Sequence, residues 1–255
     1  MSRSIDLNCD LGESYGPWRM GHDEEVMEFI TSANVACGFH AGDPLTMRAT
    51  VELARRAGVA VGAHPGLPDR LGFGRRAMAV SAAETYAMTL YQIGALAAVA
   101  RSVGVELAHV KPHGALYAMA AADPMLAEAV AAATRAAGAE LVLVGPPFSA
   151  LERAAEAAGV PFAAEVFADR TYLADGSLTP RQRPDAFVHD PEEAAARLVE
   201  IVTAGTVRAV SGEVVRLRAD TVCLHGDNPA AVAFARAVRA ALLQAGPEVR
   251  PLARR

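Results

Sequence analysis

Side chains that can transfer protons or bind metals are concentrated in short motifs of this 255-residue sequence. Asp10 and Glu13 follow one short apolar run, and His40 and Asp43 follow the next, within Cys-Gly-Phe-His-Ala-Gly-Asp. Later apolar runs are followed closely by further titratable residues, namely His64, Lys111, His113, Asp169, Arg170, His225 and Asp227. Imidazoles and carboxylates at close quarters suit general acid–base catalysis or the binding of a divalent metal.

These motifs stand at the ends of predicted strands. Short apolar runs alternate with longer amphipathic segments, which predicts strands alternating with helices. The strands are expected at residues 5–10, 33–37, 59–63, 108–111, 141–145, 163–167 and 221–224. The helices are expected at residues 22–30, 45–57, 81–103, 124–137, 148–158, 191–203 and 229–245. Strands joined by helices pair in parallel, so we predict a single α/β domain that spans residues 1–255.

The segment 207–218 departs from this alternation. Polar and apolar residues alternate on both sides of Ser211-Gly212, so we predict a small β-hairpin inserted before the last strand. In a barrel or an open parallel sheet, the carboxyl ends of all strands lie on one face, and that face carries the active site. The motifs above, together with Asn8 of the first strand, are therefore expected to converge there.

The use of lysine points to the same face. The chain has 24 lysine and arginine residues, and Lys111 is the only lysine among them. An ammonium is a compact charge whose pKa can shift, unlike that of a guanidinium. We therefore expect Lys111→Arg to leave the melting temperature nearly unchanged and to lower turnover about 100-fold or more.

A glycine-rich segment, Gly-Phe-Gly-Arg-Arg-Ala at residues 72–77, has the spacing of a dinucleotide-binding loop but follows no predicted strand. We interpret it instead as a loop that offers Arg75 and Arg76 to an anion. The Gly-x-x-x-x-Gly-Lys-Ser/Thr motif of P-loop ATP sites does not occur in the sequence. An ATP site of that type is therefore not expected in this chain alone.

Composition narrows the class of protein. Hydrophobic residues make up 52% of the chain and charged residues 21%, enough for a large core. The net charge of -5 argues against nucleic acid as a partner. No apolar run approaches the ~20 residues that span a bilayer, and the first residues lack the apolar segment of a signal peptide. Three cysteines without a CxxC pair fit a reducing compartment, so we expect a cytoplasmic protein without membrane contact.

Taken together, the motifs resemble the LamB/YcsF lactam-utilisation family. The resemblance rests on stretches spread over residues 5–228, among them Asn-Cys-Asp-Leu-Gly-Glu (8–13), Ala-Cys-Gly-Phe-His-Ala-Gly-Asp (36–43), Ala-His-Pro-Gly (63–66), Asp69 with Gly-Phe-Gly-Arg-Arg (72–76), Lys-Pro-His-Gly-Ala-Leu-Tyr (111–117), Glu-Val-Phe-Ala-Asp-Arg (165–170) and Cys-Leu-His-Gly-Asp (223–227). So many motifs in order make it specific.

The resemblance implies a seven-stranded parallel (β/α) barrel, TIM-barrel-like and related to the glycoside hydrolase and polysaccharide deacetylase superfamily. It also implies ATP-dependent opening of 5-oxoproline (pyroglutamate) to L-glutamate by a 5-oxoprolinase, in which two partners, the B and C subunits, take part. ATP would be a co-substrate of that complex.

Such a reaction needs a base for water, cations for a phosphorylated oxygen and a proton donor for the ring nitrogen. The residues expected to be catalytic are Asp10, Glu13, His64, Lys111, His113 and His225. Asp10 and Glu13 could share the role of base, and a histidine could give the proton. Substrate contacts are expected from Asn8, His40, Asp43, Arg75, Arg76, Asp169, Arg170 and Asp227.

Two other functions remain open from the sequence. Asp10, His40 and His64 could hold a divalent metal, which would make the protein a metal-dependent amidohydrolase or carbohydrate deacetylase. The His-x-x-x-His spacing common in such sites does not join the two histidines of this set; it occurs at His109 and His113 instead. A non-catalytic protein that only presents substrate to the B and C subunits is the third hypothesis, and it leaves so many titratable groups unexplained. Homo-oligomerisation is compatible with all three.

Overall fold

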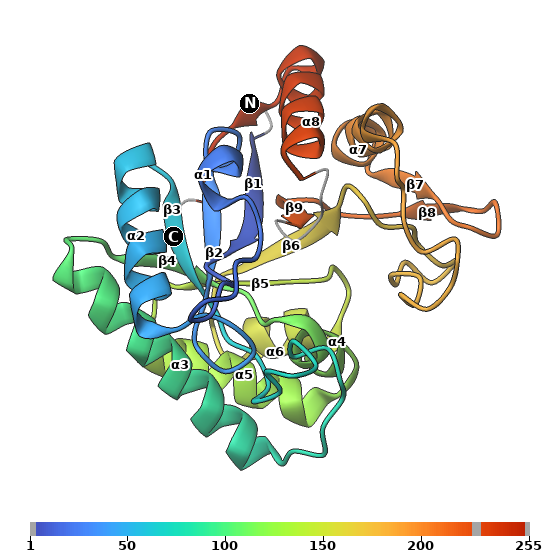
Figure 1. Ribbon diagram of the computed structural model, residues 1–255. Coiled ribbons are helices and arrows are strands. Elements are labelled where there is room, and N and C mark those ends of the chain that lie inside the picture. The colour runs from blue at the N-terminus through green and yellow to red at the C-terminus, as the bar shows by residue number, and fades with distance from the viewer. Residues whose placement is uncertain (1–3, 226–230, 253–255) are drawn as a thin grey trace.

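The structure, a computed structural model, describes residues 4–225 and 231–252, without the side chain of His225. Its centre is a closed barrel of parallel strands (Figure 1). In order around the barrel these are β1 (Ser4–Leu11), β2 (Ser32–Ala36), β3 (Ala60–His64), β4 (Leu107–Val110), β5 (Val142–Gly145), β6 (Phe162–Phe167) and β9 (Thr221–His225). The barrel closes because β9 pairs in parallel with both β6 and β1. The predicted seven-stranded barrel is therefore confirmed.

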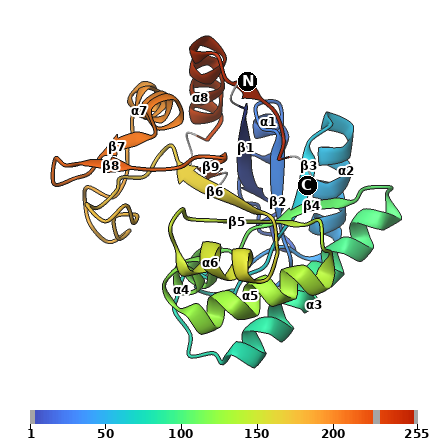
Figure 2. The same ribbon diagram turned by 180° about the vertical axis from the view of Figure 1, so that it is seen from behind.

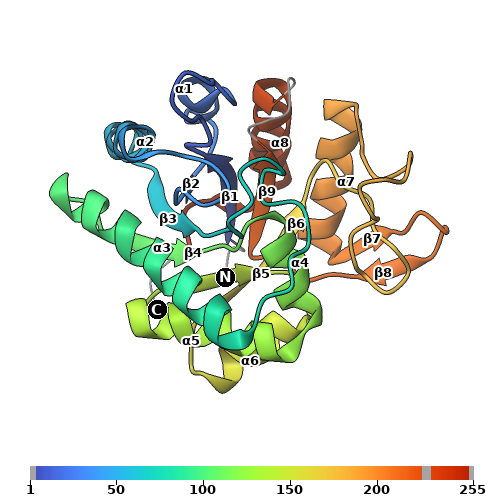
Figure 3. The same ribbon diagram turned by 60° about the horizontal axis from the view of Figure 1, so that its bottom comes forward.

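Helices surround the strands, as Figure 3 shows. They are α1 (Asp23–Val26), α2 (Pro44–Ala57), α3 (Ala82–Ser102), α4 (Gly114–Ala122), α5 (Pro124–Ala137), α6 (Ala150–Ala157), α7 (Pro191–Ala204) and α8 (Ala231–Ala245). The sequence specifies several of their ends. Ser81 and Glu84 form a reciprocal capping box at the start of α3, and Gly58 ends α2 in the left-handed conformation that glycine favours.

The predicted hairpin is present as β7 (Thr206–Arg208) and β8 (Val214–Arg216), which pair antiparallel outside the barrel. Figures 1 and 2 show it projecting from the molecule next to α7. A short strand, β10 (Glu248–Val249), adds to β1 at its amino-terminal end and was not predicted.

Two helices differ from the predictions. The helix expected at residues 22–30 is a single turn, α1, after which the chain bends so that the Thr31 amide reaches the Leu7 carbonyl at 2.8 Å. The helix α4 was not predicted, because it begins at Gly114, a residue type typical of loops. In the structure this glycine has a positive φ of 53°. Among the described residues, no single helix is long and apolar enough to span a bilayer. Helices α4 and α5 together would be long and apolar enough, by length and composition alone, but the chain bends by 116° between them.

The interior of the barrel is polar. In β1, Asp6, Asn8 and Asp10 alternate with apolar residues, and their side chains bond across the barrel to other strands. The residues that join them from neighbouring strands are Ser32, Asn34, His109, Glu165, Thr221 and Cys223. The alternate set, including Leu7, Val35 and Val222, packs in the apolar core that the helices cover. The strands are thus buried on both faces: the outward face is apolar, and the inward face carries the polar network together with a few apolar side chains such as Val142 and Val144.

Candidate active site with a histidine and glutamate group

Lys111 organises the polar interior at the carboxyl end of β4. Its ammonium lies 2.9 Å from Asp10 Oδ1, 2.8 Å from Glu165 Oε1 and 3.0 Å from Cys223 Sγ, with Asn8 Oδ1 at 3.1 Å. An ammonium has three N–H donors, and four protein acceptors surround this one. Burial alone would lower the pKa of Lys111, but the neighbouring carboxylates raise it well above its usual value. Lys111 therefore stays charged and holds Asp10 in place, with no donor left for a substrate anion.

Asp10 is a partly exposed member of this network and borders a cavity. Its Oδ1 also accepts from the Asn34 amide at 2.8 Å, which leaves Oδ2 directed towards His64 Nε2 at 3.3 Å. Its side chain is 12% exposed, whereas those of Lys111 and Glu165 are at most 4% exposed. A carboxylate fixed through one oxygen and accessible through the other is well placed to accept a proton.

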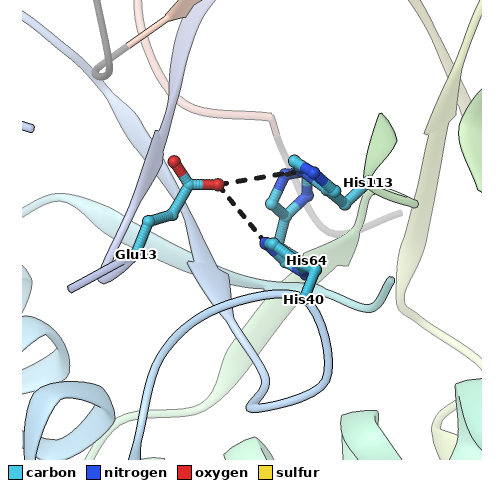
Figure 4. A group of neighbouring side chains, drawn as sticks. All are labelled: Glu13, His40, His64 and His113. Atoms are coloured by element: carbon cyan, nitrogen blue, oxygen red, sulfur yellow. Dashed lines mark hydrogen bonds and ion pairs between the residues drawn. The ribbon is translucent and has the colours of Figure 1, made fainter. Parts of the chain in front are cut away.

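Above Asp10, three histidines and a glutamate from four different loops or strand ends form one cluster (Figure 4). Glu13 follows β1, His40 follows β2, His64 ends β3 and His113 precedes α4. Glu13 Oε1 lies 3.3 Å from His40 Nε2 and 3.7 Å from His113 Nδ1. The His40 and His113 rings stack with 3.7 Å between centroids, and His64 stands edge-on to both. Their ligand atoms lie within 4.8 Å of one another, close enough to hold a metal ion.

The local backbone explains the close approach of these rings. A Cβ on Gly74 would lie 2.7 Å from the His40 Cβ, and one on Gly66 would lie 2.6 Å from the His40 Nδ1. Glycine at both positions therefore lets the loop after β3 pass directly against the imidazoles. Burial, followed by the neighbouring imidazoles, holds the pKa of His40 and of His113 well below the usual value. Both rings are neutral, which is the metal-binding form.

A cavity of about 270 Å³ opens beside Asp10, His64 and His113. Arg75 from the loop after β3 lines it, as do Arg170 and Arg181 from the segment between β6 and α7. Burial and the nearby Arg181 lower the pKa of Arg170 to about 10, so it remains a cation at neutral pH. A small cavity lined by one carboxylate and three arginines suits a compact anionic ligand.

The structure places the other predicted residues as follows. Arg75 and Arg170 line the cavity, while Asn8 lies deeper, bonded to Thr221 and Glu165. Asp43 caps α2 through the Leu45 and Thr46 amides, and it also accepts from the Gly16 amide at 2.8 Å. Arg76 pairs with Asp69 outside the cavity lining, and Asp169 is buried. The His225 side chain and Asp227 lie outside the described residues.

The group that could hold an ion overlaps the metal set expected from the sequence. His40 and His64 belong to both, and Glu13 and His113 complete the group in the structure. Asp10 lies beside this group, with Oδ1 bonded to Lys111 and Asn34 and Oδ2 3.3 Å from His64 Nε2. The sequence reasoning also missed Asn34, Glu165 and Cys223, although polar residues at alternate positions of the strands signal an inward-facing polar set.

Comparison with known proteins places the chain in a family. The model of the LamB/YcsF family matches residues 5–255. The chain belongs to the LamB/YcsF family. Its curated relatives include the A subunit of the 5-oxoprolinase of Methylococcus capsulatus, 58% identical over 246 residues that cover 96% of this chain and 95% of the relative. The A subunit from Tolumonas auensis is 57% identical over 248 residues, 97% of this chain and 99% of the relative.

Solved structures agree with the family assignment. The crystal structure of a lactam utilization protein from Thermus thermophilus is 51% identical, with a TM-score of 0.93, and covers 98% of this chain and all of its own. A GH113 beta-1,4-mannanase is 12% identical with a TM-score of 0.53 over 95% of this LamB/YcsF chain and 99% of its own. The mannanase likeness shows that the barrel fold is shared, and nothing about its reaction.

Proposed function

We propose that this chain is the A subunit of an ATP-dependent 5-oxoprolinase, which opens 5-oxoproline to L-glutamate together with its B and C subunits. The observation that carries the proposal is the cavity at the carboxyl ends of the strands, which Asp10 lines together with Arg75, Arg170 and Arg181. 5-Oxoproline is a small lactam that carries one carboxylate, and a cationic cavity of about 270 Å³ suits it. The names of the relatives at 57–58% identity support the same reaction.

The chemistry follows from the inertness of the lactam. Transfer of a phosphoryl group from ATP to the carbonyl oxygen makes the ring carbon electrophilic, and water can then add to that carbon. Asp10 takes the proton from water, and the carboxylic acid so formed returns a proton to the departing ring nitrogen. Arg75, Arg170 and Arg181 offset the negative charge of the substrate carboxylate and the phosphoryl group. Hydrolysis of the resulting acyl phosphate leaves glutamate and phosphate.

Two features support the proposal that this chain acts together with other chains in one complex. The sequence has no P-loop motif, so ATP binding is assigned to the complex rather than to this chain alone. The relatives carry the name of an A subunit, which fits an assembly of several chains. All three cysteines are free and buried, and we propose a cytoplasmic location.

The test is glutamate formation from 5-oxoproline and ATP. The chain alone should form little glutamate, and addition of the B and C subunits should restore turnover. Asp10→Asn in the reconstituted complex should lose at least about 100-fold in kcat. A chain that turns over 5-oxoproline by itself, or an active Asp10→Asn complex, would contradict the proposed assignment.

Substrate binding has its own test in the segment between β6 and α7. Arg181→Ala should raise KM for 5-oxoproline about 10–100-fold, as expected for a lost charged hydrogen bond. Arg183 is the matched control, because it is exposed, pairs with Asp185 on the same segment and lies outside the cavity lining. Equal KM values for both variants would remove Arg181 from the binding site.

A further inference from the structure

The donors and acceptors of His64 and His113 do not match unless a cation lies between them. His64 Nδ1 lies 2.7 Å from the backbone oxygen of Lys111, and His113 Nε2 lies 2.8 Å from that of Phe73. A carbonyl oxygen can only accept, so each of these ring nitrogens must carry the hydrogen. In neutral imidazoles the other nitrogens, His64 Nε2 and His113 Nδ1, then carry lone pairs.

Those two lone-pair nitrogens face each other at 3.0 Å. Two carboxylate oxygens converge on the same place, because Asp10 Oδ2 lies 3.3 Å from His64 Nε2 and Glu13 Oε1 lies 3.7 Å from His113 Nδ1. Lone pairs gathered this closely repel one another, and burial strengthens that repulsion. A positive charge between the two imidazoles is therefore needed, either a proton on one of them or a metal ion.

Several observations favour a metal ion over a proton. His113 stacks face to face on His40 with 2° between the ring planes, a contact that a second charge on His113 would weaken. Two ligating histidines already have the backbone carbonyl partners that commonly orient metal ligands. The separations of 3.0, 3.3 and 3.7 Å within the group are near the roughly 3.4 Å between ligand atoms of a tetrahedral zinc ion with bonds of about 2.1 Å.

We propose that Glu13, His40, His64 and His113 bind one divalent transition-metal ion of the zinc class. Three imidazoles and one carboxylate suit zinc, cobalt, nickel or iron, whereas magnesium and calcium prefer sites made of oxygen ligands. His64 and His113 also line the cavity, so the ion would adjoin the place where Asp10 meets substrate. A metal bound there would act as a Lewis acid toward a carbonyl or phosphoryl oxygen. The proposal concerns binding by this chain and does not depend on the reaction.

The experiment measures metal binding by the single chain. Metal content is determined after purification, and the chelated protein is titrated with Co²⁺, whose visible absorption reports tetrahedral coordination by nitrogen and oxygen. We expect one ion per chain and at least about 100-fold weaker Co²⁺ binding in His113→Gln. His109→Gln is the matched control, because His109 is equally buried in the barrel but bonds Asn34 and lies outside the group. It should still bind one ion.

Two results would overturn the proposal: no Co²⁺ binding by the wild-type chain below about 1 mM, or a ¹⁵N spectrum showing His64 doubly protonated in metal-supplemented protein. If His113→Gln fails to fold, anomalous scattering at the metal edge from wild-type crystals locates the ion and decides the question. A chain that binds no metal but supports glutamate formation would reject this site alone. Metal-loaded protein without glutamate formation in the reconstituted complex would reject the proposed function alone.

Discussion

Replacing Lys111 by methionine tests the central network most directly. The side chains are similar in length, but the substitution removes the only ammonium that Asp10 and Glu165 contact at 2.9 and 2.8 Å. Breaking a buried ion pair costs about 3–5 kcal/mol, because the remaining charges stay buried without compensation. For a chain of this size, each kcal/mol shifts the melting temperature by about 2–4 °C, so we expect a loss of about 6–20 °C.

The assay is thermal unfolding followed by circular dichroism at pH 7. Arg48→Met is the surface control, since Arg48 pairs with Glu52 on an exposed face of α2 and should cost no more than about 0.5 kcal/mol. The double variant Lys111→Met/Glu165→Gln should recover part of the loss, because one of the two uncompensated carboxylates becomes neutral. A Lys111→Met protein as stable as wild type would refute the proposed network.

Other predictions follow from single side chains. Gly62→Ala should lower the free energy of unfolding, measured by chemical denaturation, by about 1–3 kcal/mol, because a Cβ there overlaps the His109 ring. Gly94→Ala, at an open position of α3, should instead raise it by about 0.5–1 kcal/mol. Ser81→Ala should cost about 1 kcal/mol by the same measurement through loss of the capping box. Burial and the nearby Lys111 lower the pKa of His109 from 6.5 to about 3, so only the unfolded chain gains this proton between those values. The stability that neutral His109 contributes is complete above pH 6.5 and is lost as pH falls towards 3. In denaturation experiments across pH 4–6, the free energy of unfolding of His109→Gln should therefore change less steeply with pH than that of the wild type, by up to about 1.4 kcal/mol per pH unit.

The sequence predicted the barrel well because its strands are short apolar runs bounded by helix signals. It predicted α4 poorly, since Gly114 resembles a loop residue and the following Asp123-Pro124 marks a new helix start. Helix α1 was overextended because apolar residues such as Phe29 and Ile30 continue past its single turn and pack in or against the core outside the helix.

The candidate site shows the same limits at the level of side chains. Spacing indicated which residues stand at strand ends, but an aspartate before a proline can cap a helix or bind a ligand, and Asp43 does the first. Arg181 carries no local signal, because only the path of the segment between β6 and α7 brings it to the cavity. The expectation that Lys111→Arg leaves stability unchanged is revised: Lys111 is 3% exposed, and a bulkier guanidinium among its four partners should cost about 1–3 kcal/mol.

The burial of Lys111 gives the protein a built-in chemical reporter. Because it is the only lysine of the chain, its amine and the terminal α-amino group are the only primary amines that an acylating reagent can modify. Lys111 borders the cavity but is only 3% exposed, so its acylation requires the residues packed around the ammonium to move apart. Mass spectrometry of the modified chain would then report the opening of the site at one defined position, much as amide exchange does along a backbone, without any engineered label.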